Sequence, residues 1–296
     1  MKLLSVVTAK GPRLAASLPS GILVFSEAPE LFAGKASSVP FTLRAAITIR
    51  GGLERLLPLL QSAVDHPDAG KFIVPQDKLK LAIPFDPGNV FCVGLNYRDH
   101  AQEGNAPIPQ QPMLFAKWTS AMVGPGQAIV LPPDTQEVDY EAELGVVIGK
   151  KCRGVSADKA LDYVAGYLCV NDVSACDFQR MDGQFVRAKS QDTFGPIGPW
   201  MVTRDELVDP QALGIRCSVN GRMLQNSNTR EMIFGVRELI AFISRGITLH
   251  PGDLISTGTP SGVGFAQKPP VFLHAGDEVA VEVDGIGRLS NPVRAM

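Results

Sequence analysis

Several features are scarce or absent in this chain of 296 residues, and each absence excludes a class of protein. Positive charge is not in excess, since the formal net charge is -2, which argues against binding to nucleic acid or to an anionic membrane surface. No apolar stretch is long enough to cross a membrane. The five cysteines are odd in number and lack Cys-x-x-Cys spacing, so we expect reduced thiols, no disulfide framework and a cytoplasmic location.

Breaks rich in proline and glycine divide the chain into two predicted domains. Residues 1–82 are expected to form a small N-terminal α+β domain, with strand-like runs at 3–7, 21–25 and 41–49 and an amphipathic helix at 53–65. Residues 84–88 are expected to form a linker. Residues 83–296 are expected to form a mostly β domain with helices near 157–163, 175–181 and 232–245, the last of them capped at Asn228.

The most informative segment is VDYEAELGVVIG, residues 138–149. Because side chains of a strand alternate between its faces, Asp139, Glu141 and Glu143 are expected to share one face. The apolar run that follows suggests a buried strand, in which neighbouring carboxylates need a proton or a cation between them. A divalent metal ion meets that need. The alternative is the solvated polar face of an edge strand.

A third carboxylate, Asp172, follows the apolar segment YLCVN. An acid at the point where a buried strand emerges can turn back toward the same site as Glu141 and Glu143. Three carboxylates without a cluster of histidines or cysteines favour a hard ion in an oxygen-rich site, hence Mg2+ or Mn2+. For Asp172 alone, a helix N-cap is an equally good interpretation.

A second pair of polar residues, His100 and Glu103, follows the apolar run at residues 90–95. Their spacing of three places both on one side of a single helical turn. A carboxylate that holds one imidazole nitrogen leaves the other free to take a proton from water, as a general base requires. An exposed pair on a surface turn is the alternative, and it is the commoner case for this motif alone.

Two further segments offer groups for a substrate. Lys189 stands among small residues and precedes a loop rich in glycine and proline, so it can reach a substrate oxygen, although most lysines are simply solvated. The segment STGTPSGVGF, residues 256–265, exposes backbone N–H groups and hydroxyls that can hold a carboxylate. It lacks the Gly-Lys-Ser/Thr ending of a phosphate-binding loop, so nucleotide binding is not expected.

Five motifs, in order GLNYRDHAQE, DYEAELGVVIG, NDVSACDFQ, AKSQDTFGPIGP and STGTPSGVG, resemble those of the fumarylacetoacetate hydrolase family over residues 90–293. The resemblance implies a β-roll catalytic domain and a homodimer, acting in the catabolism of aromatic compounds or sugar acids. It also implies a role for each of eight residues. These are metal ligands at Glu141, Glu143 and Asp172, a water-activating dyad at His100 and Glu103, and substrate contacts at Lys189, Gln179 and Thr259.

One position departs from the family pattern. Cys176 stands where the family segment carries a substrate-binding arginine. A thiol cannot replace the bidentate hydrogen bonding of a guanidinium group to a carboxylate. We therefore expect Cys176 to line the substrate pocket and the preferred substrate to carry a neutral group there. Alternatively, Cys176 is a buried core thiol, or Arg180 or Arg187 takes over the missing role.

The residues and the family resemblance together imply a divalent-metal-dependent hydrolase. It would cleave a carbon–carbon bond in an acylpyruvate or a related 2,4-dioxo acid through a metal-bound enolate. The same enolate serves other reactions, so the alternative is an oxaloacetate decarboxylase/tautomerase or a 2-hydroxyhepta-2,4-diene-1,7-dioate isomerase. An alternative of another class is a non-catalytic 2-oxo acid binding protein, against which the presence of both His100 and Glu103 argues.

Overall fold

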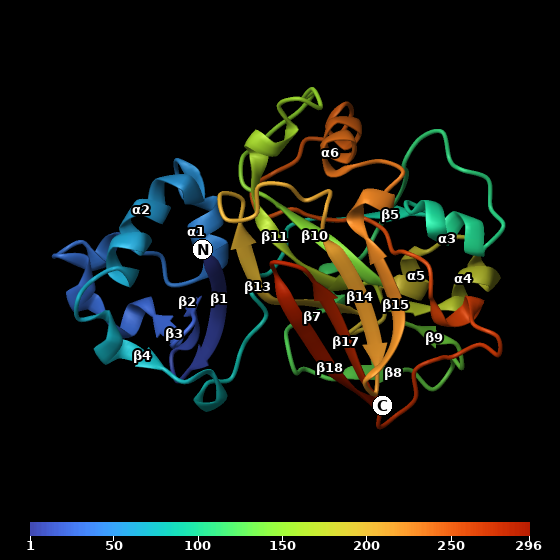
Figure 1. The fold of residues 1–296 in the computed structure, drawn as a ribbon, viewed down its shortest axis with the longest axis horizontal. Coiled ribbons are helices and arrows are strands. Elements are labelled where there is room, and N and C mark those ends of the chain that lie inside the picture. The colour runs from blue at the N-terminus through green and yellow to red at the C-terminus, as the bar shows by residue number, and fades with distance from the viewer.

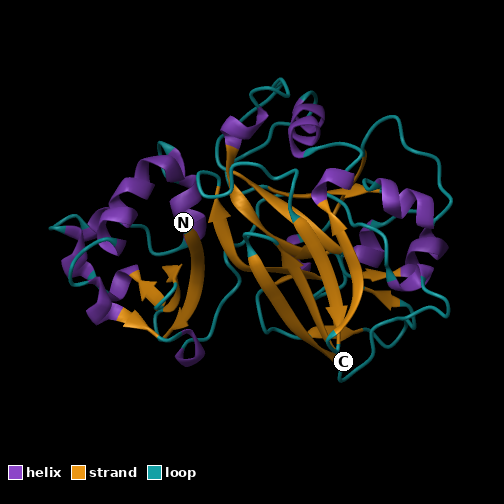
Figure 2. Ribbon diagram, in the orientation of Figure 1, coloured by secondary structure: helices purple, strands orange, loops and turns teal.

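The computed structural model describes residues 1–296 and has an α+β fold in which strands predominate, which confirms the predicted fold class. Figure 1 shows a smaller lobe built from the N-terminal part of the chain beside a larger lobe. Figure 2 shows that the strands of the larger lobe form its centre, with helices at its edges. Among these helices, none combines the length and the apolar character that crossing a membrane requires.

The smaller lobe contains four strands and two α-helices: β1 (Lys2–Thr8), β2 (Gly11–Leu18), β3 (Gly21–Val24), β4 (Ile73–Val74), α1 (Leu43–Thr48) and α2 (Gly52–Val64). Helix α2 confirms the helix predicted at 53–65. The strand predicted at 41–49 is wrong, because α1 occupies this segment. The Thr42 hydroxyl accepts a hydrogen bond from the Ala45 N–H at 3.2 Å, as a helix cap does. The buried residues Leu43, Ala46 and Ile47 have helical spacing.

One long sheet runs through both lobes. Its order is β4-β3-β2-β1-β13-β11-β10-β16-β5-β6, and β7 pairs with β13. The strands of the larger lobe in this sheet are β5 (Val90–Gly94), β6 (Met113–Ala116), β7 (Met122–Val123), β10 (Ala142–Ile148), β11 (Val164–Asn171), β13 (Gly195–Thr203) and β16 (Leu254–Ser256). Because β1 pairs antiparallel with β13, the lobes share backbone hydrogen bonds. The domain boundary at residue 82 stays a prediction.

A second sheet of five strands covers one face of the long sheet, in the order β15-β14-β17-β18-β8. Its strands are β8 (Ile129–Leu131), β14 (Gly214–Val219), β15 (Arg222–Asn228), β17 (Glu278–Val283) and β18 (Gly287–Ala295). Leu144 and Val146 of β10 pack with residues of β17 in the main core. Val147 faces the other way and packs in a core that the smaller lobe shares. This alternation also turns Glu143 away from the main core.

The helices of the larger lobe are α3 (Arg98–Glu103), α4 (Cys176–Asp182), α5 (Val186–Lys189) and α6 (Val236–Ser244). Helices α3, α4 and α5 gather at the end of this lobe that lies farthest from the smaller lobe (Figure 1). Helix α4 confirms the helix predicted near 175–181. Near 157–163 the chain forms only a short 3-10 turn, Ala160–Tyr163.

Helix α6 begins later than predicted. Asn228 caps a separate 3-10 turn, Thr229–Glu231, through a hydrogen bond from the Arg230 N–H at 3.0 Å. The cap of α6 is Gly235, whose N–H donates to the Glu238 carboxylate at 2.7 Å. The predicted cap residue therefore starts a turn, and the helix follows a few residues on.

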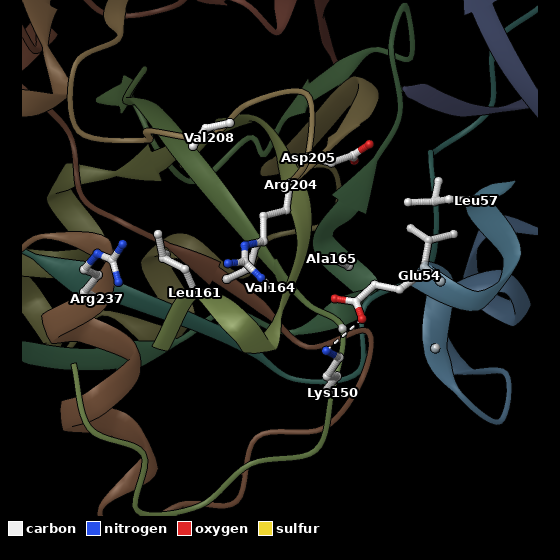
Figure 3. A pocket seen from close by; sticks show the side chains of 13 residues that line it. Glu54, Leu57, Lys150, Leu161, Val164, Ala165, Arg204, Asp205, Val208 and Arg237 are labelled. Atoms are coloured by element: carbon white, nitrogen blue, oxygen red, sulfur yellow. Dashed lines mark ion pairs between the residues drawn. The ribbon is translucent and has the colours of Figure 1, made fainter. Parts of the chain in front are cut away.

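The two lobes also meet beside α2. Glu54 of α2 pairs with Lys150 (Figure 3), their charged atoms 2.9 Å apart, and both residues line a cavity of about 300 Å³. Apolar side chains from both lobes, among them Leu57 and Leu161, line this cavity. None of the residues predicted to act in catalysis belongs to it.

Candidate active site

The predicted strand at 138–149 is interrupted, and the interruption separates its acids. Strand β9 (Val138–Asp139) pairs with the short β12 (Ser174–Ala175), and β10 starts only at Ala142. The prediction that Asp139 shares a face with Glu141 and Glu143 is therefore wrong. Its carboxylate instead accepts hydrogen bonds from the N–H groups of Tyr140 (2.8 Å), Gly264 (2.7 Å) and Phe265 (2.8 Å).

The other three acids come together. Glu141, Glu143 and Asp172 each place a carboxylate oxygen within 4.8 Å of the others. The Asp172 N–H donates to the Glu141 carbonyl at 2.9 Å across the start of β10 and the end of β11. Glu143 accepts hydrogen bonds from the Ser256 hydroxyl (2.5 Å) and the Gly258 N–H (2.9 Å). Three neighbouring segments thus fix these carboxylates, which we call the acid group.

Burial makes the acid group electrostatically costly. Glu143 and Asp172 are almost inaccessible to solvent. Burial, with Asp172 and Glu141 nearby, raises the pKa of Glu143 to about 8. Burial would also raise the pKa of Asp172, but Lys117 and Lys189 hold it below its usual range. If all three carboxylates were ionised, these two ammonium groups would leave one negative charge uncompensated, so Glu143 keeps its proton at neutral pH when no other cation is present.

A divalent cation fits this acid group. Asp172 Oδ1 is buried, and the Lys117 Nζ lies 2.8 Å from it. The candidate ligands are all carboxylate oxygens, the ligands that Mg2+ and Mn2+ prefer. A divalent ion held by Glu141, Glu143 and Asp172 would take the place of the Glu143 proton and compensate the charge of the ionised carboxylates.

Lys189, at the end of α5, lies against the acid group. Its Nζ donates to Glu141 Oε2 (2.9 Å), Asp172 Oδ2 (2.8 Å) and the Ser174 hydroxyl (2.8 Å). Burial would lower the pKa of Lys189, but Asp172 and Glu141 outweigh it and raise the pKa. A lysine ammonium has three N–H donors, so all are in use here. Reaching a substrate oxygen requires giving up one of these contacts.

Lys117 is a component of the site that the sequence did not suggest. Its ammonium group is buried and lies between Asp172 and backbone carbonyls. It donates to the carbonyls of Phe194 (2.9 Å), Val173 (3.3 Å) and Lys189. These partners come from three separate parts of the chain, so Lys117 holds the far side of Asp172 in place.

His100 and Glu103 form the expected pair. His100 Nδ1 lies 3.1 Å from Glu103 Oε2 on α3. The Gly262 N–H donates to Glu103 Oε1 at 2.9 Å, so the loop after β16 fixes the carboxylate. The Phe265 ring packs edge-on against the imidazole. With Nδ1 held by Glu103, Nε2 is the nitrogen left for chemistry.

The dyad and the acid group face one cavity of about 300 Å³. It is lined by His100, Glu141, Glu143, Lys189, Gln179, Thr259, Cys176 and Arg180, and by apolar side chains that include Phe115 and Phe185. The structure thus brings most of the predicted site residues together. Glu103 and Asp172 lie behind this lining, each in contact with a residue of it.

Two of the side chains predicted to contact the substrate already have partners within the protein. The Thr259 hydroxyl donates to the Ala142 carbonyl (3.0 Å) and accepts from Gln225 (2.8 Å), so it is already engaged. Cys176 lies against the carboxylate of Asp139 with its Sγ at 3.8 Å. Burial raises the pKa of its thiol. Cys176 is therefore a neutral part of the cavity wall.

Asp139 anchors the loop that carries Gly262 and Phe265. Replacing it with alanine should lower the free energy of unfolding by about 2 to 4 kcal/mol, because three backbone N–H groups lose their acceptor. Chemical denaturation measures the change. Asp139→Asn is the control, since it keeps an acceptor oxygen and should cost less. Equal stability of the two variants would contradict an anchoring role.

Comparison with known proteins places this geometry in a family. The model described as fumarylacetoacetate (FAA) hydrolase C-terminal matches residues 89–294. A mitochondrial oxaloacetate tautomerase of Xenopus laevis is 48% identical over 237 residues, 79% of this chain and 74% of the relative.

Two solved structures extend the comparison. Fumarylacetoacetate hydrolase from Exiguobacterium antarcticum superposes with a TM-score of 0.84 at 34% identity, covering 100% of both chains. 2-Hydroxyhepta-2,4-diene-1,7-dioate isomerase from Mycobacterium marinum superposes at 0.75 and 34% identity, covering 100% of this chain and 98% of that one. The matched residues include the acid group and the His100–Glu103 pair. The chain belongs to the fumarylacetoacetate hydrolase family.

Proposed function

We propose that this protein interconverts the enol and keto forms of a small dicarboxylic 2-oxo acid such as oxaloacetate. The observation that carries the proposal is one cavity that is faced both by a buried group of three carboxylates and by an imidazole with a free nitrogen. The similarity to an oxaloacetate tautomerase supports this reaction among those of the family. The alternatives given from the sequence thus receive more support than carbon–carbon hydrolysis does.

The acid group would supply the electrostatics. A Mg2+ or Mn2+ ion held by Glu141, Glu143 and Asp172 would provide positive charge against the 2-oxo oxygen and the adjacent carboxylate. Lys189 and Lys117 hold Asp172 from two sides, and Lys189 also holds Glu141. These two lysines therefore act as positioning residues for the carboxylates.

His100 would move the proton. In ketonisation, carbon 3 of the enol gains a proton and the hydroxyl at carbon 2 gives one to water. His100 Nε2 can deliver the proton to carbon 3 and, in the reverse direction, remove it. Glu103 orients the imidazole. The side chain of His100 is 13% exposed, so bulk water has limited access to this step.

The second candidate is carbon–carbon hydrolysis of an acylpyruvate. The same dyad favours it, because His100 held by Glu103 can take a proton from water as well as from carbon. The structural similarity to a fumarylacetoacetate hydrolase also supports it. Enol decay of oxaloacetate and cleavage of acetylpyruvate, both followed by absorbance with Mg2+ or with EDTA, separate the two reactions. Binding of both compounds without turnover of either would instead favour a non-catalytic 2-oxo acid binding protein.

His100→Ala tests the proton transfer. We expect catalysed ketonisation of oxaloacetate to fall by about two to four orders of magnitude, the usual range for a positioned acid or base. Stopped-flow absorbance of the enol measures the rate. His66→Ala, at a half-buried histidine of the smaller lobe, is the control and should match the wild type. A His100→Ala protein with an unchanged rate would assign proton transfer elsewhere.

A further inference from the structure

A dicarboxylic substrate brings two carboxylates into the cavity. A metal ion held by the acid group would bind only the one next to the 2-oxo group. The second carboxylate needs a cation with free donors, since an unpaired charge entering a partly desolvated cavity is costly. The position where the sequence leads one to expect an arginine holds Cys176, whose neutral thiol cannot meet this need. The need for such a cation rests on the proposed function.

The cations available in the cavity are few. Lys189 and Arg180 are the only lysine and arginine in its lining. Lys189 already gives its three N–H donors to Glu141, Asp172 and Ser174. It therefore has no donor left for a distal carboxylate.

We propose that Arg180 binds the second carboxylate and so determines the specificity of the cavity for dicarboxylic 2-oxo acids. Cys176 and Arg180 are four residues apart on α4, which puts them on the same face of the helix, and both line the cavity. The guanidinium group of Arg180 donates one hydrogen bond, from Nη2 to Glu137 Oε2 at 2.6 Å. A guanidinium group has five donors, so it can hold Glu137 and a substrate carboxylate together.

Arg187, the other arginine nearby, has a different environment. Two of its nitrogens donate to the Asp182 carboxylate at 2.6 and 2.7 Å, and its guanidinium group lies over the Phe178 ring. Arg187 does not line the cavity. It therefore serves as a matched control, being a second exposed, ion-paired arginine on the same stretch of chain.

The side chain of Arg180 is 62% exposed, so it lies at the mouth of the cavity, whereas Glu143 is buried at its inner end. A substrate would then lie with its 2-oxo acid end inward and its second carboxylate outward. Partial exposure also limits the effect, because water competes for the guanidinium group. We expect a contribution of roughly tenfold, as for a charge-assisted hydrogen bond that is not fully buried.

The test compares oxaloacetate with its 4-methyl ester, which lacks the second charge. The ratio of their kcat/KM values should favour oxaloacetate in the wild type. Arg180→Gln should lower this ratio by about tenfold, through oxaloacetate alone. Arg187→Gln should leave the ratio unchanged. Melting curves of both variants should match the wild type, since both side chains are at the surface.

An unchanged ratio in Arg180→Gln, or an equal fall in Arg187→Gln, would overturn the inference. Dissociation constants of the same two compounds, measured by calorimetry on Mg2+-loaded protein, keep the inference separate from the proposed function. If the wild type binds oxaloacetate but turns over neither compound, the proposed reaction fails. The inference then still requires that Arg180→Gln weaken the binding of oxaloacetate about tenfold and leave that of the ester unchanged. Equal affinity of the wild type for the two compounds would also overturn it.

Discussion

Replacing Glu143 with glutamine should abolish the stabilisation of the protein by Mg2+ and lower turnover by about a thousandfold or more. The activity loss follows from removing a metal ligand, whose ion stabilises the transition state by several kcal/mol. In the wild type, free Mg2+ at about one hundred times its Kd should raise the free energy of unfolding by about 2.7 kcal/mol. Thermal melts with and without Mg2+ measure this difference.

The metal-free Glu143→Gln protein should be no less stable than the wild type. Glutamine keeps an oxygen for the Ser256 hydroxyl and the Gly258 N–H. The pKa of Glu143 in the folded protein is raised to about 8, above the ordinary pKa of a glutamate. The stability that comes from its bound proton is therefore lost as the pH rises from the ordinary glutamate pKa through about 8. The neutral amide has no such dependence. Glu282→Gln, at an exposed acid, is the control. A variant that melts lower without metal yet still responds to Mg2+ would make Glu143 a structural residue only.

Lys117→Met should lower the free energy of unfolding by about 3 to 5 kcal/mol, the range observed when one partner of a buried ion pair is removed. The change leaves the Asp172 carboxylate with one cation in place of two, and it deprives three buried carbonyls of a donor. Urea denaturation of the metal-free protein measures it. Activity should fall as well, because Asp172 loses the contact on its far side.

Lys150→Met is the matched control for Lys117→Met. Lys150 pairs with Glu54 at 2.9 Å, but both side chains are exposed, and such pairs contribute less than about 1 kcal/mol. A Lys117→Met protein that is no less stable than the control would show that the buried contacts of Lys117 contribute nothing measurable.

Much of the candidate site could be read from the sequence, because its residues stand in compact motifs. Glu141 and Glu143 are two residues apart at the start of β10, and His100 and Glu103 share one helical turn, so local spacing was enough to group them. Lys117 lies outside these motifs and meets Asp172 only through the fold. The predicted orientation of Asp139 was wrong for a similar reason. The strand breaks at Tyr140, where β9 pairs with β12, and the local sequence pattern does not indicate that pairing.

The predicted secondary structure was wrong where two local sequence signals competed. Residues 41–49 contain β-branched side chains that favour a strand, yet Thr42 caps a helix and Leu43, Ala46 and Ile47 are spaced for one. Packing against α2 decides between the two. The pairing of β1 with β13 joins segments almost two hundred residues apart, and no local pattern specifies it.

The most direct test of the account is the position of a bound metal ion. Crystals grown with Mn2+ and measured at the manganese absorption edge should show one anomalous peak per chain, bounded by the carboxylates of Glu141, Glu143 and Asp172. A peak elsewhere, or none at a saturating Mn2+ concentration with Lys189 still the only cation between Glu141 and Asp172, would contradict it.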